Sequence, residues 1–212
     1  MARGRFITFE GGEGAGKSTQ VRRLVERLDT AGIPALATRE PGGAPGAEDI
    51  RRLLVSGDVA RWDALTEALL HYAARRAHVK ATIAPALAAG TWVVSDRFAD
   101  STMAYQGYGH GLGREAIDAL HRLVVGDFAP DLTFILDLPV ERGLARATAA
   151  ARGEDRYERM DHAFHERLRE GFLDIAGREP LRCVVIDADG TVDAVAEAVR
   201  AAVQERLKVS LP

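Results

Sequence analysis

The sequence has few of the features that mark secreted, membrane or nucleic-acid-binding proteins. It has one cysteine, Cys183, which excludes an internal disulfide, and its place in the apolar run "LRCVVID" predicts a buried core residue. The net charge of −3 leaves no basic excess for a nucleic acid or an anionic membrane. The longest stretch without a charged residue, 81–95, contains Pro85 and Gly90 and is shorter than the roughly 20 apolar residues of a membrane helix.

The sequence also shows no targeting signal and no sign of a second domain. The first ten residues, "MARGRFITFE", lack the apolar core of a signal peptide. No internal repeat, low-complexity linker or change of composition divides the 212 residues, of which 47% are hydrophobic. We therefore expect a soluble, cytoplasmic protein with a single α/β domain over residues 1–212.

What the sequence does contain is a regular alternation of short apolar runs and helical patterns. Runs rich in β-branched or aromatic residues predict strands at 5–10, 33–39, 91–96, 132–138 and 183–187. The segments between them predict helices at about 17–31, 47–56, 61–89, 114–125, 140–151, 157–177 and 191–207. Apolar strands separated by helices indicate an α/β protein, with a parallel sheet covered on both faces.

The stretch "FEGGEGAGKST" joins the first predicted strand to the first predicted helix. It contains the spacing Gly-x-x-x-x-Gly-Lys-Ser of a phosphate-binding loop. In such a loop the backbone N–H groups surround nucleotide phosphates at the positive end of the helix, the lysine reaches the β- and γ-phosphates, and the serine hydroxyl ligates Mg²⁺. The guanine-reading Asn-Lys-x-Asp element of GTPases is absent, which favours ATP. The predicted nucleotide-binding residues are Gly11, Gly12, Glu13, Gly14, Ala15, Gly16, Lys17, Ser18 and Thr19.

A second group of polar residues, "VVSDRFADSTMAYQG", follows the third predicted strand. Asp96 and Arg97 come at its carboxyl end, where open α/β sheets place their ligands. The aspartate is suited to hold Mg²⁺-bound water, and the arginine to grip a phosphate through two parallel hydrogen bonds. Two further segments are expected at the same edge: "TREPGG" after the second strand, and "LLHYAARRAHV" with Arg75 on a helix. Taken alone, that helix is typical of amphipathic packing.

Together these segments resemble bacterial thymidylate kinases. The resemblance lies in "FEGGEGAGKST", "TREPGG", "LLHYAAR", "SDRFADSTMAYQG", "PDLTFILDLPVE" and "RGEDRYE", in the family's order from Arg5 to about Val195. It implies a three-layer phosphate-loop fold with five parallel strands and a small lid at about 146–158. The implied reaction is transfer of the γ-phosphoryl group of ATP to dTMP, with Mg²⁺ as cofactor. A homodimer packed through helices of the central segment is implied as well.

The resemblance also implies roles for residues around the phosphates. Lys17 and Arg97 would stabilise the transferring group, and Glu13 would bind the 3′-hydroxyl of the deoxyribose. One branch of the family carries a basic catalytic residue at the position of Gly14; with glycine here, arginines of the lid are implied to act instead. These are Arg152 and Arg156 as catalytic residues, with Arg146 beside the bound nucleotide, whose adenine would lie near the loop 187–190.

Another set of residues is implied to recognise dTMP. Arg75 would hydrogen-bond a thymine carbonyl, Thr102 would meet the edge of the ring, and Tyr105 would crowd the 2′ position of the sugar. Ser101 and Gln106 complete this set. Where the family has a phenylalanine that stacks on thymine, this sequence has His71. If His71 stacks, its pKa should fall beside Arg75; alternatively Tyr72 takes that role, or His71 is an ordinary helix residue.

Two other functions are compatible with a phosphate loop. A deoxynucleoside kinase accepts the phosphoryl group on a neutral hydroxyl, so it needs a general base, and it would leave "TREPGG" unexplained. An ATP-binding regulatory module without catalysis would show an eroded lysine, lid or Asp-Arg pair, and all three are intact in this sequence.

Overall fold

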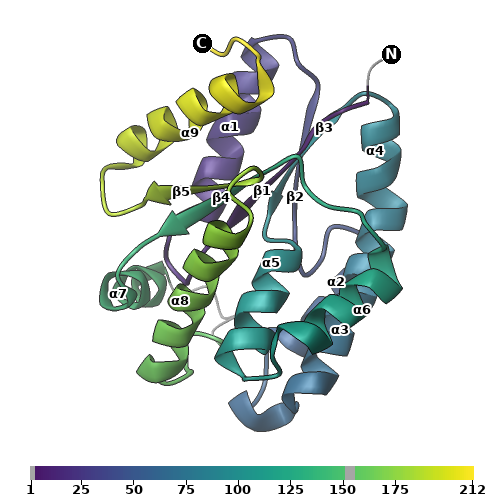
Figure 1. Ribbon diagram of the computed structural model, residues 1–212, viewed down its shortest axis with the longest axis vertical. Helices are drawn as coiled ribbons and strands as arrows, with labels where there is room; N and C mark the ends of the chain where they lie inside the picture. The colour runs from purple at the N-terminus through teal and green to yellow at the C-terminus, as the bar shows by residue number, and fades with distance from the viewer. Residues whose placement is uncertain (1–2, 151–155) are drawn as a thin grey trace.

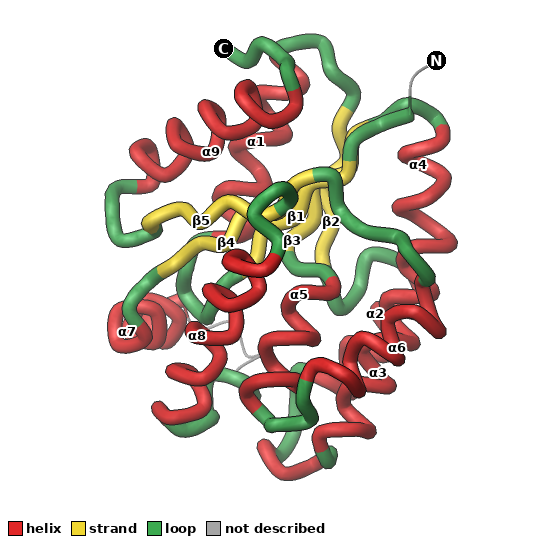
Figure 2. The backbone as a smooth tube through the Cα atoms, in the orientation of Figure 1, coloured by secondary structure: helices red, strands yellow, loops and turns green. Residues whose placement is uncertain are grey.

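A five-stranded parallel sheet runs through the middle of the molecule (Figure 1, Figure 2). The computed structural model describes residues 3–150 and 156–212. The strand order is β2-β3-β1-β4-β5, and each neighbouring pair is parallel. All five predicted strands are confirmed: β1 (Phe6–Glu10), β2 (Ala35–Arg39), β3 (Trp92–Asp96), β4 (Leu132–Asp137) and β5 (Cys183–Asp187).

The central strand β1 directs the chain to the functional edge of the sheet. All five of its residues are buried, and Phe9 lies opposite Asp96 in the register with β3. Side chains alternate between the two faces, so Ile7 and Phe9 enter one apolar cluster and Phe6 enters another. Because parallel strands end at the same edge, the loop after Glu10 begins beside the carboxyl end of β3.

Helices cover both faces of the sheet, which confirms the three-layer α/β fold (Figure 1). On one face, α1 (Lys17–Thr30) and α9 (Val192–Leu207) pack on the strands through residues such as Leu24 and Val199. On the other face, α4 (Ala84–Ala88) and α8 (His162–Arg178) pack through residues such as Leu87 and Phe172. The other α-helices of the described chain are α2 (Pro45–Leu54), α3 (Ala64–His78), α5 (Ala99–Thr102), α6 (Arg114–Val125) and α7 (Val140–Ala150).

The single helix predicted over 61–89 is divided in the structure. A 3₁₀ turn, η1 (Val59–Arg61), precedes α3, and a π-helical stretch, η2 (Val79–Ile83), joins α3 to α4. Pro85 lies in the first turn of α4, where its missing N–H and its ring prevent the regular bond to the carbonyl four residues before it. The wider π turn accommodates this change within one continuous helical path.

The sequence pattern predicts no helix or strand for the segment that follows β3. It forms the short helix α5 and a π-helical stretch, η3 (Met103–Gly109), most of which is buried. The helix predicted from residue 157 begins only at His162, because Asp161 caps it by accepting a hydrogen bond from the backbone N–H of Phe164 (2.6 Å).

Two further expectations concern burial and membranes. Cys183 is a free thiol, buried at the start of β5 as predicted, and burial raises its pKa to about 12. Across the described residues, the helices are too short or too polar to cross a lipid bilayer.

Candidate active site

The phosphate loop connects β1 to α1 and leaves the helix N-terminus open. Gly16, the residue before α1, has a left-handed backbone (φ 91°) and supplies no capping side chain to the first N–H groups. Lys17 folds back over the loop, and its ammonium donates to the carbonyl oxygens of Gly11 (3.1 Å) and Gly12 (2.7 Å). Backbone donors and one cation therefore surround the space at the end of β1, an arrangement suited to an anion.

Gly14 has a steric reason in this loop. Its φ is +66°, and a Cβ added there would lie 2.0 Å from the carbonyl oxygen of Gly143 on α7. Any larger residue would force α7 away, since the two atoms nearest to this Cβ belong to the backbone of Gly143. Arg146, one turn further along α7, also lies against this position. The absence of a basic side chain at Gly14 thus goes together with an arginine supplied by α7.

Lys17 is a buried charge. It is 7% exposed, and burial lowers its pKa to about 8, helped by the nearby Arg97 and opposed by Glu13 and Asp96. A negatively charged phosphate placed beside it would reverse that effect. Ser18 meets the end of β3, where its hydroxyl donates to the carboxylate of Asp96 (2.5 Å). The two predicted metal ligands are therefore adjacent, and hard oxygen donors of this kind fit Mg²⁺.

Arg97 joins the phosphate loop to η3. Its backbone is left-handed (φ 71°), an uncommon conformation for a residue with a side chain. Its guanidinium donates to Gly11 O (3.1 Å), to the hydroxyl of Ser101 (3.1 Å), to the carboxylate of Glu13 (3.0 Å) and to the hydroxyl of Tyr105 (2.8 Å). Tyr105 also donates to Glu13. Four of the predicted site residues are thus brought together around one cation.

Electrostatics in this group follow from burial and pairing. Burial by itself would raise the pKa of Glu13, but the charges of Arg97 and Lys17 outweigh it and lower that pKa. Burial likewise opposes the charge on Arg97, yet Tyr105 and Glu13 raise its pKa overall. Glu13 and Arg97 are therefore charged partners at neutral pH.

Glu10 supports the loop that carries Arg97, although it was not among the predicted site residues. It is fully buried at the end of β1, and its carboxylate accepts the backbone N–H of Phe98 (2.7 Å) and the hydroxyl of Ser101 (2.5 Å). A glutamate at the end of an otherwise apolar strand was the available signal.

Arg75 is held in a buried network on α3. Its guanidinium pairs with Glu40 (2.8 Å) and donates to Phe98 O (2.9 Å) and to the hydroxyl of Thr102 (3.0 Å). Its other terminal nitrogen, Nη1, has no hydrogen-bond partner among the described residues. Thr102 is 1% exposed and accepts this hydrogen bond from Arg75, and its contact with the thymine ring stays a prediction.

Glu40 and His78 complete this network, and sequence reasoning missed both. The second oxygen of Glu40 lies 3.0 Å from Nδ1 of His78, whose Nε2 lies 2.7 Å from the hydroxyl of Thr38. The segment "TREPGG" therefore supports Arg75 and His78 of α3. The motif itself is recognisable in the sequence. The partner of Glu40 on α3, 35 residues away in the chain, is not.

His71 faces the cleft from α3, one turn before Arg75. Its Nε2 lies 2.9 Å from the hydroxyl of Tyr157. Burial lowers its pKa to about 4, and the charge of Arg75 acts in the same direction, as expected for a histidine in this place. Tyr72 is in the core, 1% exposed, with its hydroxyl directed to Ile117 O, so it is not available to stack on a base.

This pKa predicts how stability should depend on pH. The pKa of His71 is 6.5 when unperturbed and about 4 in the fold, so between these values the unfolded chain binds a proton that the folded chain does not. Stability should therefore fall as the pH is lowered through this window. Between pH 7 and pH 5 we expect the wild type to lose roughly 1–2 kcal/mol more than His71→Phe, as measured by urea unfolding. Equal losses in the two proteins would show that His71 is not responsible.

The cleft between these groups has a volume of about 920 Å³. It runs from the phosphate loop past Arg97 to α3, η3 and the residues after 155. The predicted site residues that line it are Glu13, Gly14, Gly16, Lys17, Ser18, Thr19, His71, Asp96, Arg97, Ser101, Tyr105, Gln106 and Arg146.

The three arginines assigned to the lid have different positions. Arg146 lines the cleft, and it donates to Ala188 O (3.1 Å) in the loop 187–190 after β5. Arg152 lies outside the described residues. Arg156 is fully buried and pairs with Glu67 on α3 (2.5 Å), so the structure does not bring it to the phosphate loop. The expectation that Arg156 reaches the phosphates is wrong for this conformation, because a buried guanidinium is most stable beside a carboxylate.

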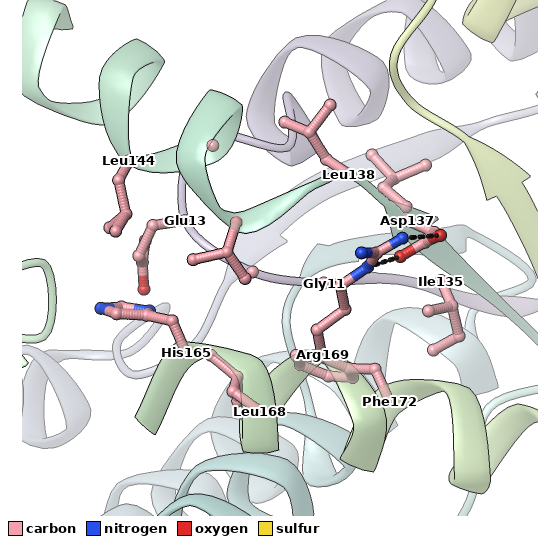
Figure 3. A pocket seen from close by; sticks show the side chains of 14 residues that line it. Gly11, Glu13, Ile135, Asp137, Leu138, Leu144, His165, Leu168, Arg169 and Phe172 are labelled. Carbon is pink, nitrogen blue, oxygen red and sulfur yellow. Dashed lines mark hydrogen bonds and ion pairs between the residues drawn. The ribbon is translucent and has the colours of Figure 1, made fainter. Parts of the chain in front are cut away.

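A small cavity of about 20 Å³ lies behind the phosphate loop (Figure 3). Within it the carboxylate of Glu13 points toward the imidazole ring of His165 on α8, and Arg169 pairs with Asp137 (2.7 Å). His165 is 3% exposed, and its Nε2 has no hydrogen-bond partner among the described residues. Burial lowers its pKa, and Glu13 opposes that shift. Sequence reasoning missed His165, since a histidine on the apolar side of a helix reads as core.

The fold and the cleft define the class: a phosphate-loop nucleotide-binding α/β protein with a second polar pocket beside the loop. Residues 9–199 match the family model described as thymidylate kinase. The chain is 58% identical over 207 residues to the thymidylate kinase of Caulobacter vibrioides, covering 98% of this chain and 99% of that one. It is 54% identical over 213 residues to that of Nitrobacter hamburgensis, covering 99% and 92%. The chain belongs to the thymidylate kinase family.

Solved structures agree with this assignment. The crystal structure of thymidylate kinase from Ehrlichia chaffeensis superposes with a TM-score of 0.77 at 38% sequence identity, over 95% of this chain and 99% of that one.

Proposed function

We propose that this chain transfers the γ-phosphoryl group of ATP to dTMP, giving dTDP and ADP. Family membership over nearly the whole chain supports the reaction. The observation that carries the proposal is the position of Arg97, which contacts Gly11 of the phosphate loop and Tyr105 of η3 at once. A cation there meets the phosphate of an acceptor nucleotide while Lys17 meets the donor phosphates.

The chemistry needs cations and orientation rather than a base. An oxygen of the dTMP phosphate attacks the γ-phosphorus, and the bond from that phosphorus to the bridging oxygen of ADP breaks. The acceptor is already ionised at neutral pH, so no proton has to be removed. The remaining barrier comes from aligning two anions and spreading charge over the moving group. Lys17, Arg97, Arg146 and the loop N–H groups supply positive charge around it.

Mg²⁺ belongs to the proposal as the cofactor, held by the adjacent oxygens of Ser18 and Asp96. When bound, it neutralises charge on the donor phosphates. Arg152 is proposed as the lid arginine, within a lid at about 146–158 of a single domain, 1–212.

Two buried groups match the hydrogen-bonding pattern of a thymine. Arg75 has a donor, Nη1, and Gln106 has an acceptor, Oε1, that lack partners among the described residues. Thymine offers a carbonyl to the first and an N3–H to the second. Leaving both unpaired costs free energy that a bound base restores. Tyr105, 5% exposed and fixed by Arg97 and Glu13, is placed to exclude a 2′-hydroxyl.

A homodimer in the cytoplasm, where ATP is available, completes the proposal. Large apolar side chains are exposed along α3 and α6, namely Leu65 (48%), Leu69 (50%) and Leu123 (81%). Exposed leucines in neighbouring helices favour contact with a second copy through this part of the chain.

A coupled ADP-release assay tests the reaction directly. We expect turnover with dTMP, weaker turnover with dUMP, and none with thymidine or without an acceptor. Chelating Mg²⁺ should abolish turnover. Turnover with thymidine but not dTMP would support a deoxynucleoside kinase, and no turnover with any acceptor would support a binding module.

Variants of His71 give a second test, which concerns only the binding of dTMP. We expect His71→Ala to weaken dTMP binding by about 1 kcal/mol or more, the range for loss of an aromatic–base stack, while His71→Phe preserves or tightens it. Titration of dTMP into the three proteins measures this. Tyr157→Phe is a comparison variant, because it removes only the hydroxyl that contacts His71 and leaves both rings. If all four proteins bind dTMP equally, His71 does not touch the base.

A further inference from the structure

Arg156 is buried at the end of the segment that follows α7, and its side chain is almost fully occupied. It is 0% exposed. Its guanidinium donates to the carbonyl oxygens of Leu54 (3.3 Å), Asp58 (3.0 Å) and Val59 (2.9 Å), and it pairs with the carboxylate of Glu67 (2.5 Å). These contacts hold Arg156 between the end of α2, η1 and α3. Moving it to a phosphate would leave Glu67 as an unpaired buried charge.

Glu67 divides its two oxygens between Arg156 and the acceptor pocket. Oε2 accepts from Arg156, and Oε1 accepts from the side-chain amide of Gln106 (2.7 Å). His110 lies 3.5 Å from Oε1. Burial opposes the charge of Glu67, but His110, His71 and Arg156 outweigh it and lower its pKa to about 2. The amide of Gln106 is therefore oriented by a carboxylate that stays charged at neutral pH, with its carbonyl oxygen left for another partner.

The residue after Arg156 reaches the same pocket by a second route. The ring of Tyr157 lies beside the Arg156 guanidinium (5.3 Å) and packs edge-to-face on Tyr105 (5.2 Å, 83°). Its hydroxyl lies 2.9 Å from Nε2 of His71. Two neighbouring residues of the chain thus contact the three acceptor-side residues Gln106, Tyr105 and His71, directly or through Glu67.

We propose that Arg156 is a positioning residue of the dTMP pocket, acting through Glu67 on the Gln106 amide and through Tyr157 on His71 and Tyr105. It sets the affinity for the acceptor nucleotide and does not touch the transferring phosphoryl group. This inference rests on the proposed function, because it takes the pocket to be the site of dTMP.

The test separates acceptor affinity from chemistry. Titrating dTMP in the absence of ATP, we expect Arg156→Met to bind at least tenfold more weakly than the wild type. In steady-state assays KM for dTMP should rise similarly, with KM for ATP within twofold and kcat at saturating dTMP within about threefold. Arg27→Met is the control, because it breaks an ion pair with Glu197 between α1 and α9, away from the cleft. A kcat lowered at least thirtyfold with unchanged dTMP affinity would overturn the inference and make Arg156 catalytic.

A charge-neutral double variant distinguishes positioning from stability. Glu67→Gln with Arg156→Met leaves no buried unpaired charge, so its thermal stability should recover relative to Arg156→Met. Its affinity for dTMP should stay low, because the Gln106 amide has lost its carboxylate. Recovery of dTMP affinity together with stability would show a merely structural role and overturn the inference.

Hydrogen exchange of the wild-type protein gives a further test of the inference. We expect dTMP alone to protect the backbone amides of 156–160 and 103–109, and an ATP analogue alone to leave them unchanged. Protection that appears only with the ATP analogue would overturn the inference. A wild type that neither binds nor phosphorylates dTMP would instead refute the proposed function.

Discussion

Replacing Lys17 by alanine is expected to lower kcat by at least about 100-fold, the loss typical of removing one preorganised donor to the transition state. The ammonium contacts Gly11 O and Gly12 O in the loop, and burial has already lowered its pKa to about 8. A phosphate placed beside this ammonium would stabilise its charge. Steady-state kinetics with ATP and dTMP measures the effect, while dTMP binding should be preserved because Lys17 is proposed to contact the donor phosphates.

The matched control for this variant is Lys80→Ala, which removes an exposed lysine from η2. It should leave kcat unchanged. If Lys17→Ala is folded, as shown by thermal unfolding, and retains near-normal kcat, Lys17 has no part in the reaction.

Replacing Arg97 by methionine is expected to lower kcat/KM for dTMP by roughly 10²–10³-fold, with KM for ATP changed less than about threefold. The guanidinium is the cation shared by Glu13, Ser101 and Tyr105, at the point where the phosphate loop meets η3. Its loss removes the group proposed to grip the acceptor phosphate. Steady-state kinetics with dTMP as the varied substrate measures the change.

Arg97→Lys provides the internal comparison. Lysine keeps the charge but cannot make two parallel hydrogen bonds, so we expect it to recover only a small part of the lost activity. All three residues have a Cβ, so the left-handed backbone at this position (φ 71°) bears on each alike. Should Arg97→Met keep kcat/KM for dTMP within threefold, another cation must bind the acceptor phosphate.

The sequence was a good guide wherever a signal is local. The five strands follow from short apolar runs, because burial on both faces of a parallel sheet requires them. The phosphate loop was recognised from eight consecutive positions, since its glycines, lysine and serine act at a fixed spacing along one turn of chain. Asp96 and Arg97 were placed correctly at the edge of the sheet because the end of β3 decides their position.

The sequence did not predict the roles of residues whose partners are distant in the chain. Arg156 read as a lid arginine, yet its partner Glu67 is 89 residues away in the chain. Thr102, predicted to meet the base, accepts a hydrogen bond from Arg75, which is 27 residues away in the chain. His165 gave no signal, because only the packing of α8 under the loop brings it toward Glu13.

The sequence by itself determined the α/β fold, the phosphate loop and the family, since these rest on periodicity and on motifs within single segments. Only the tertiary structure decided which polar side chains face the cleft and which are held behind it. Two arginines assigned to the same lid segment, Arg146 and Arg156, have different positions: Arg146 lines the cleft, and Arg156 is buried against Glu67 of α3. The reason is that a buried charge takes the position where its partners are, and those partners come from elements that only folding brings together.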